Sequence, residues 1–237
     1  MKTHYVGNAF LLGLFVTLFF LSSCSSLLSA NFNTDTPGSA PDPSLPGEPS
    51  GDALIFTAPF GDHLEIVNLP AFPSKALKFK NLESGRETNR GGIIFQANST
   101  NFKKPLTFTW AGAKFGTGSV LNITLGLSPS FVMANLQIDN SGDLSLLTLS
   151  GTTLLGRLRP EKKYSFVVSF SPSDRNFTIT VVGRGEPTIR ESGISFFTTS
   201  DFPSSIRPTF GMKFDNENVN PEHYYILDDL VIAIKDE

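Results

Sequence analysis

Residues 164–181 read YSFVVSFSPSDRNFTITV, and this stretch decides the fold. From Tyr164 to Phe170, aromatic and aliphatic side chains alternate with smaller residues. The segment 171–176 is rich in serine, proline, aspartate and asparagine, which favour turns, and the alternation resumes at Phe177. Because successive side chains of a strand point to opposite faces, the pattern predicts a β-hairpin that buries one aromatic face.

Similar alternating runs recur over residues 53–237, each bounded by glycine, proline, asparagine or serine. No segment keeps a helical apolar stripe for three turns, so little helix is expected. The alternation is clearest over 121–127 and 208–214, and further strands are predicted near 54–57, 64–67, 76–80, 92–97, 106–110, 131–138, 144–149, 193–198 and 224–234. About a dozen strands predict an all-β, two-sheet jelly-roll sandwich, because an immunoglobulin domain has only about seven to nine.

The composition supports one core without disulfides. Hydrophobic residues make up 40% of the chain, charged residues 17%, and 22 residues are phenylalanine. Cys24 is the only cysteine, so no internal disulfide can form. The net charge of −3 argues against a nucleic-acid partner. Stability must come from the packed core, in which Trp110 is expected because it alternates with Leu106 and Phe108.

The N-terminal segment has the features of a bacterial lipoprotein signal. Lys2 precedes an apolar run over residues 9–21, which is too short to span a membrane, since a spanning helix needs about 20 residues. The sequence Leu-Ser-Ser-Cys over residues 21–24 resembles the lipobox, in which the cysteine becomes the lipidated N-terminus. We therefore expect residues 1–23 to be removed and Cys24 to be lipidated. The alternatives are a signal peptide with an incidental cysteine and an uncleaved membrane anchor.

Residues 24–52 are rich in proline, glycine and serine, a composition typical of a flexible linker. We expect a lipidated tether that spans about 30 Å and contributes nothing to the core. Ser25, which follows the cysteine, resembles the signal that sends lipoproteins of Gram-negative bacteria to the outer membrane. The predicted location is therefore the cell envelope, lipid-anchored at the outer membrane of a Gram-negative bacterium, with a folded domain over residues 53–237.

Three segments resemble one known superfamily. They are residues 76–80 (ALKFK), the hairpin 164–182 and the C-terminal run 224–232 (YYILDDLVI). They look like the laminin G-like branch of the concanavalin A-like lectin/glucanase superfamily, most specifically in the C-terminal run. The resemblance implies a curved jelly roll whose concave face or loop rim often binds glycans, sometimes with calcium. It implies no particular reaction, because one fold hosts many functions.

Known catalytic motifs are missing from the sequence. The laminarinase-type members of this superfamily use Glu-x-Asp-x-x-Glu, and no glutamate after residue 52 has an aspartate two positions on. There is no Gly-x-Ser-x-Gly nucleophile motif either. His63 and His223 stand in polar loops, where a solvated role is expected. No catalytic residue is predicted, and the sequence argues against an enzyme.

Acidic residues near the C-terminus form the candidate binding sites. Asp228 shares a strand face with Ile226 and Leu230, so its carboxylate must be hydrogen-bonded or bind a cation. The preceding loop, 215–222, concentrates carboxylate and amide oxygens, which are the ligands that calcium takes. The predicted ligand-binding residues are Asp215, Asn216, Glu217, Asn218 and Asn220, and the predicted calcium ligands are Asp215, Glu217 and Asp228. The competing interpretations are a solvated acidic turn and a carboxylate that accepts backbone N–H groups.

The leading functional hypothesis is a membrane-tethered, non-catalytic binding module of the bacterial envelope that recognises a polysaccharide or cell-wall glycan. The other partners considered are the membrane, through the lipid on Cys24, and an envelope protein. A structural accessory subunit of an outer-membrane assembly is the alternative, and a polysaccharide-degrading enzyme is the third hypothesis. Oxygen-rich groups or aromatics in a groove favour glycan binding, whereas a wide exposed apolar patch favours assembly.

Overall fold

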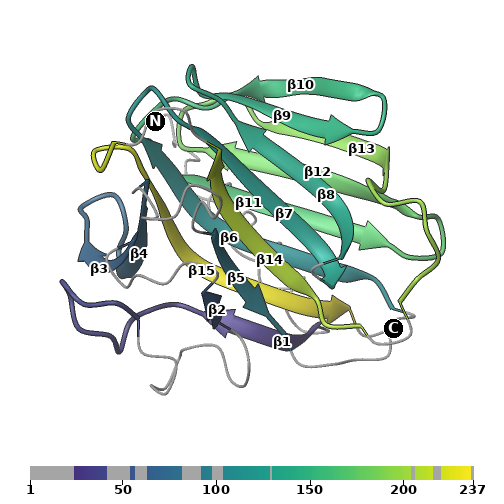
Figure 1. Cartoon of the computed structure of the whole chain (residues 1–237), viewed down its shortest axis with the longest axis horizontal. Helices are drawn as coiled ribbons and strands as arrows, with labels where there is room; N and C mark the ends of the chain where they lie inside the picture. Colours follow the sequence, from purple (N-terminus) through teal and green to yellow (C-terminus); the bar gives the residue numbers. More distant parts are fainter. Residues whose placement is uncertain are drawn as a thin grey trace, which may run out of the picture.

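The computed structural model describes residues 24–41, 54–56, 63–81, 92–97, 104–128, 130–203, 206–215 and 220–235. These residues form fifteen strands in two antiparallel sheets, whose strands overlie one another in Figure 1. No α-helix occurs in the described ranges. The prediction of an all-β, two-sheet jelly roll is confirmed.

One sheet has eight strands and the other has seven. The path of the first runs through β13 (Ile189–Ser195), β12 (Asn176–Gly183), β11 (Tyr164–Ser171), β6 (Leu106–Phe115), β15 (Tyr224–Lys235), β4 (Lys75–Lys80) and β3 (Leu64–Asn68), with β1 (Cys24–Ala30) paired to β15. The second runs through β10 (Gly151–Arg157), β9 (Asp143–Thr148), β8 (Phe131–Ile138), β7 (Val120–Ser128), β14 (Thr209–Asp215), β5 (Gly92–Gln96) and β2 (Leu54–Phe56). Of these strands, β1 and β10 are not predicted by the alternation. Strand β13 begins four residues before its predicted start.

Aromatic side chains from both sheets fill the core. In the hairpin, residues 164–171 pair with 176–183 in one continuous register, as the alternation predicts. Phe166 stacks on Trp110 with 4.7 Å between ring centroids, and Trp110 meets Phe210 of the other sheet edge-on at 5.1 Å. Trp110 is 2% exposed, so its prediction as a core residue is confirmed. These interlocking rings join the two sheets where no disulfide can.

Strand β15 changes its neighbour half-way along. Tyr224–Leu227 pair with β4, whereas Leu230–Lys235 pair with β1. A register shift between Asp228 and Val231 lies at this change, and Asp229 there has a positive φ of 51°. A bulge bends and twists a strand locally, which fits a strand that serves two successive neighbours.

The N-terminal segment belongs to the sandwich, so the flexible tether expected at 24–52 does not hold for residues 24–41. Figure 1 shows β1 beside β15, and Leu28, Ala30 and Phe32 are buried in the core. The chain beyond β1 is fixed to β3 by two backbone hydrogen bonds of 2.8 Å that join Gly38 and Ser39 to Ile66. The physical reason is that burial of these alternating apolar side chains stabilises the segment, although its composition is largely polar. Residues 42–53 lie outside the described residues.

The membrane-related predictions concern other parts of the chain. The predicted signal peptide, residues 1–23, lies outside the described residues. Within the part that the structure describes, no helix is long and apolar enough to cross a membrane. Cys24 is the first residue of β1 and pairs with Lys235. Its lipidation stays a prediction.

Candidate functional site

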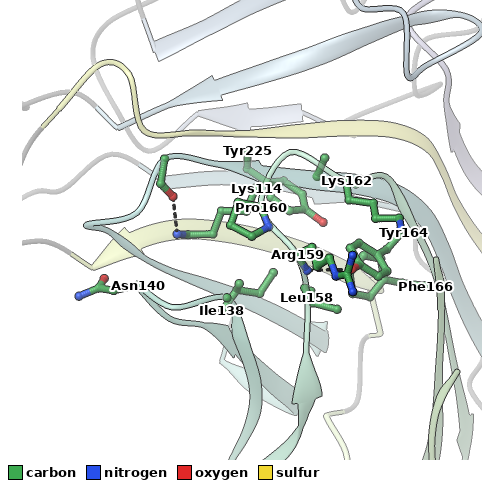
Figure 2. A pocket seen from close by; sticks show the side chains of 14 residues that line it. Lys114, Ile138, Asn140, Leu158, Arg159, Pro160, Lys162, Tyr164, Phe166 and Tyr225 are labelled. Atoms are coloured by element: carbon green, nitrogen blue, oxygen red, sulfur yellow. Dashed lines mark hydrogen bonds between the residues drawn. The ribbon is translucent and has the colours of Figure 1, made fainter. Parts of the chain in front are cut away.

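Loops from both sheets meet at one end of the sandwich, which we call the loop pole. They are the turns 116–119, 139–142 and 184–188 and the segments 158–163 and 220–223. A narrow pocket opens there between the sheets (Figure 2). Its labelled lining comes from β6, β8, β11 and β15 and from the loops that follow β8 and β10: Lys114, Ile138, Asn140, Leu158, Arg159, Pro160, Lys162, Tyr164, Phe166 and Tyr225.

Lys114 is the buried cation of this pocket. Strand alternation turns its side chain inward, and the residue is only 7% exposed. The ammonium donates a hydrogen bond to Gly116 O at 3.2 Å, drawn as the dashed line in Figure 2. Burial lowers the pKa of Lys114, and the Asp139 carboxylate opposes that shift. The hydrocarbon stem therefore forms pocket wall, while the turn after β6 holds the charged end.

Two tyrosines line the inner part of the pocket. The Tyr225 hydroxyl accepts a hydrogen bond from Trp110 Nε1 at 3.2 Å, and Tyr225 is 1% exposed. Burial raises the pKa of Tyr225 well above its usual range, and the hydrogen bond from Trp110 opposes that shift. The Tyr164 hydroxyl accepts a hydrogen bond from Arg159 N at 2.8 Å. Both hydroxyls are thus engaged in hydrogen bonds within the protein.

Two cations at the pocket mouth share one carboxylate. Glu186 forms an ion pair with Lys162 and lies 3.3 Å from Arg159 Nε. The hydrogen bond from Lys162 is the main cause that lowers the pKa of Glu186. This carboxylate contacts both cations and offsets one of their two positive charges, so protein groups already occupy the mouth. We interpret the pocket as part of the packing at the loop pole and place the candidate binding site on a sheet.

The outer face of the seven-stranded sheet carries two adjacent rows of side chains. One row crosses the strands through Leu154, Ser145, Gln137, Asn122, Lys213 and Gly92. The next row passes through Thr152, Leu147, Asn135, Thr124, Gly211 and Ile94. The alternate residues, such as Leu121 and Phe210, are buried between the sheets, which fixes the outward direction of both rows.

We call the central side chains of these rows the amide face: Asn122, Thr124, Asn135, Gln137 and Lys213. They come from β7, β8 and β14, which are consecutive strands of the sheet. Because neighbouring strands lie about 4.8 Å apart, the five strands from β9 to β5 extend the rows over about 19 Å. A surface of this length is longer than one sugar ring and has room for a chain.

The amide face offers both hydrogen-bond donors and acceptors. Gln137 Nε2 donates to Asn122 Oδ1 at 3.3 Å, which leaves Gln137 Oε1 as an acceptor and Asn122 Nδ2 as a donor. Asn135 Oδ1 is shielded from solvent and accepts no hydrogen bond from the described residues. A buried polar atom without a partner costs about 1 to 3 kcal/mol, and this oxygen would accept from a ligand hydroxyl once the side chain turns toward the solvent. This mixed set suits sugar hydroxyl groups, which donate and accept.

Glycine residues leave parts of the amide face without a side chain above the backbone. Gly211 lies opposite Thr124, and a Cβ at Gly211 would come within 2.6 Å of the Thr124 hydroxyl oxygen. At Gly126, a Cβ would lie 2.5 Å from Phe131 O. No side chain can stand at either position without a shift of its neighbours. The result is a flat floor beside the amides.

The predicted binding loop begins at the end of β14, two residues beyond Lys213. Asp215 is exposed there, and Asn220 Oδ1 accepts a hydrogen bond from Glu222 N at 2.9 Å. The other predicted residues, Asn216, Glu217 and Asn218, lie outside the described residues. In the described part of the chain, no three His, Cys, Asp or Glu side chains are grouped to hold a metal.

The predicted metal ligand Asp228 has partners inside the protein. It is 0% exposed, and its carboxylate accepts hydrogen bonds of 2.8 Å from Ser74 Oγ and from Asp229 N. Burial raises the pKa of Asp228, and the Ser74 hydrogen bond opposes that shift. Asp228 belongs to the eight-stranded sheet, whereas Asp215 belongs to the other. The geometry therefore supports the hydrogen-bonded interpretation of Asp228.

Neither histidine has the solvated position expected from the sequence. His63, just before β3, is 4% exposed. His223 packs against Gly116 and Gly118, where an added Cβ would come within 2.2 Å and 2.6 Å of the imidazole. The sequence shows both histidines among polar neighbours, but it does not show that distant glycines leave room for the His223 ring.

The amide face was not predicted from the sequence. Its signal is the alternation of Asn122 and Thr124 with buried leucine and isoleucine on β7, and of Asn135 and Gln137 with buried residues on β8. This alternation marks the outer side of each strand. Only the pairing of β7 with both β8 and β14 brings these side chains beside Lys213.

No protein-family model matches the sequence, and no curated protein matches it significantly. Among solved structures, the PL-14 alginate lyase from Aplysia kurodai matches with a TM-score of 0.62 and 14% identity, over 89% of this chain and 99% of the lyase. The catalytic domain of a glycoside hydrolase family 131 protein from Coprinopsis cinerea matches with a TM-score of 0.60 and 13% identity, over 87% and 93%. Lectin II from Ulex europaeus matches with a TM-score of 0.55 and 8% identity, over 90% and 100%. At these identities the fold alone is shown: the chain has the concanavalin A-like lectin/glucanase jelly-roll fold, which lectins and glycan-processing enzymes share.

Proposed function

We propose that this protein is a membrane-tethered, non-catalytic glycan-binding module of the bacterial cell envelope. The observation that carries the proposal is the amide face, where Asn122, Asn135 and Gln137 present hydrogen-bonding groups along consecutive strands. A fold shared with lectins supports the same conclusion. The ligand lies across the strands, along the two rows, with its hydroxyl groups on the amides.

The chemistry of the amide face suits binding better than catalysis. Asparagine, glutamine and threonine side chains neither gain nor lose a proton near neutral pH, so they orient a ligand without acid–base action. These groups can hold a glycan, and the proposal therefore assigns no reaction.

Attachment to the outer membrane through a lipid on Cys24 is part of the proposal. Because Cys24 begins β1, an acyl chain on it would join the sandwich directly, without a flexible spacer. Lys235, its partner, ends β15, whereas Tyr224 begins it near the loop pole. The twelve residues of β15 are joined by eleven steps of about 3.3 Å, which separate the two ends by about 36 Å. The loop pole would then point away from the lipid.

The attachment is tested by Cys24→Ala in the full chain. The variant should lose membrane association or accumulate as an unprocessed precursor, because the lipid supplies the anchor. A variant that still fractionates with membranes as the processed protein would refute the lipoprotein assignment.

Glycan binding is tested on a chain that starts at residue 24 and carries Cys24→Ser, since this chain keeps every described strand. The chain is applied to an array of bacterial and algal polysaccharides, beside variants Asn122→Ala and Asn135→Ala. Asn68→Ala, an exposed change at the end of β3 in the other sheet, is the matched control. Binding that both amide-face variants weaken and the control keeps supports the proposal. No binding to any glycan would overturn it and favour the accessory-subunit hypothesis.

Calcium at the loop 215–222 is a secondary proposal. Asp215 stands at the end of β14 and Glu217 follows in the loop, so both remain proposed ligands together with loop amides. Asp228 is left out because Ser74 and Asp229 already occupy its carboxylate. If calcium binds here, it should raise the melting temperature of the chain, and Asp215→Ala should remove that rise.

A further inference from the structure

We infer that the glycan bound on the amide face is acidic, carrying carboxylate or sulfate groups, and that Lys213 selects it. This inference rests on the proposed glycan-binding function and names the class of ligand. Lys213 lies directly opposite Asn122 in the pairing of β14 with β7, and Asn122 lies opposite Gln137 in the pairing of β7 with β8. One ammonium and two amides therefore form a single row across three strands.

No carboxylate in the described part of the chain pairs with the Lys213 ammonium. The residue is exposed, and the structure shows no ion pair or hydrogen bond from it to another described residue. The other lysines on strands differ: Lys80 pairs with Glu65 at 2.7 Å, and Lys114 donates to Gly116 O. An unpaired cation beside the amides of Asn122 and Gln137 is positioned to receive an anionic group from a ligand.

Among the residues that the structure describes, the carboxylates nearest this row lie on one side of it. Asp215, Asp139 and Asp143 stand toward the loop pole from the row of Lys213. Asp143 pairs with Arg157 at 3.3 Å, and Asp139 accepts hydrogen bonds from the backbone of Ser141 and Asp143. Like charges repel, so these residues oppose an acidic chain near the loop pole. They favour its placement over Lys213 and Asn135.

The order of Lys213, Asn122 and Gln137 in the row also determines which groups of an acidic glycan each side chain would bind. A carboxylate or sulfate oxygen accepts from Lys213 Nζ, while neighbouring hydroxyl groups donate to Gln137 Oε1 and accept from Asn122 Nδ2. Adjacent residues in the row lie about 5 Å apart, so groups on one or two consecutive sugars reach all three. A neutral glycan would use the amides and leave the ammonium without an ionic partner.

The test compares polysaccharides that differ in charge alone, by calorimetry at low and at moderate salt. The probes are polygalacturonate against its methyl ester, and dextran sulfate against dextran. The protein is the chain from residue 24 with Cys24→Ser, in four forms: unchanged, Lys213→Gln, Lys213→Arg and Lys104→Gln. Lys104 is an exposed lysine before β6, in the eight-stranded sheet, and serves as the matched loss of one charge.

We expect the unchanged chain to bind at least one acidic polymer about tenfold more tightly than its neutral counterpart, which is the usual size of one charged hydrogen bond. Lys213→Gln should abolish this preference, whereas Lys213→Arg and Lys104→Gln should keep it, and added salt should reduce it. A preference for polygalacturonate alone identifies carboxylates, and one for dextran sulfate alone identifies sulfates.

Two outcomes would overturn the inference while the glycan-binding function stands. One is equal affinity for the acidic and neutral polymers, and the other is an equal loss in Lys213→Gln and Lys104→Gln. If no glycan of any kind binds, the proposed function itself fails.

Discussion

Ser74 Oγ donates a 2.8 Å hydrogen bond to Asp228 Oδ2, although the two residues are 154 positions apart in the sequence. Ser74 comes directly before β4, and Asp228 stands at the bulge of β15, just after the segment that pairs with β4. The bond thus fixes the start of β4 at the point where the pairing of β15 changes from β4 to β1. It also gives a buried carboxylate the donor that it needs.

Loss of this carboxylate should destabilise the fold. Asp228→Ala leaves Ser74 Oγ and Asp229 N without their acceptor, at a cost of about 1 to 3 kcal/mol in the free energy of unfolding. Asp228→Asn keeps an acceptor and should cost less. Urea denaturation measures both, and equal values for the two variants would contradict the hydrogen-bonding role.

Substitutions of the neighbouring residue, Asp229, should change the stability through the backbone conformation instead. Asp229 is exposed and has a φ of 51°, in the left-handed region that glycine adopts most easily. Asp229→Ala should cost about 1 kcal/mol, less than Asp228→Ala, while Asp229→Gly should be neutral or stabilising. A glycine variant less stable than the alanine variant would show that the Asp229 side chain matters more than its φ.

Removal of β1 should destabilise the domain. A chain that starts at Gly51 lacks Leu28, Ala30 and Phe32, which are buried in the main core. Leu28→Ala alone should lower the free energy of unfolding by about 2 to 5 kcal/mol, and the truncation by more. Ser29→Ala, an exposed change in the same strand, is the control. Equal melting temperatures for chains that start at residues 24 and 51 would mean that residues 24–41 act as a tether after all.

Acid should weaken the contact between the segment 158–163 and the turn 184–188 within the loop pole. The pKa of Glu186 is lowered in the folded protein by Lys162, so its contribution to stability is complete above the unfolded value of about 4.3 and is lost as pH falls through the folded value. Glu186→Gln should therefore be less stable than the unchanged chain at pH 7 and approach it below pH of about 4. A difference that stays constant with pH would exclude this ion pair as its cause.

The hairpin 164–181 shows what local pattern can establish. Its alternation predicts both strands, the turn and the buried face, because the two strands are adjacent in sequence and pair in one continuous register. The expected flexibility of residues 24–41 is the opposite case. Seven of these 18 residues are serine, proline or glycine, and the alternation is limited to Leu28, Ala30 and Phe32, which are buried.

The candidate site could be predicted only in part for a related reason. A polar residue between apolar ones, such as Asn122, indicates an outer face, but its neighbours depend on pairing between strands far apart in the sequence. Lys213 reaches Asn122 only because β14 inserts between β7 and β5. The sequence predicts a site in the loop 215–222 because residues with carboxylate or amide oxygens follow one another there. The amide face, by contrast, is assembled from three separate strands.

The lateral position of β1 beside Leu230–Lys235 has a consequence for association between copies of the chain. Without β1, this half of β15 would present unpaired N–H and C=O groups along an open sheet edge, which is a template for strand addition. The β1 of a second molecule has the matching register, so a detached strand invites exchange between subunits. A segment of seven residues, Cys24–Ala30, therefore occupies this edge of β15, and its detachment would open the edge to a strand from another molecule.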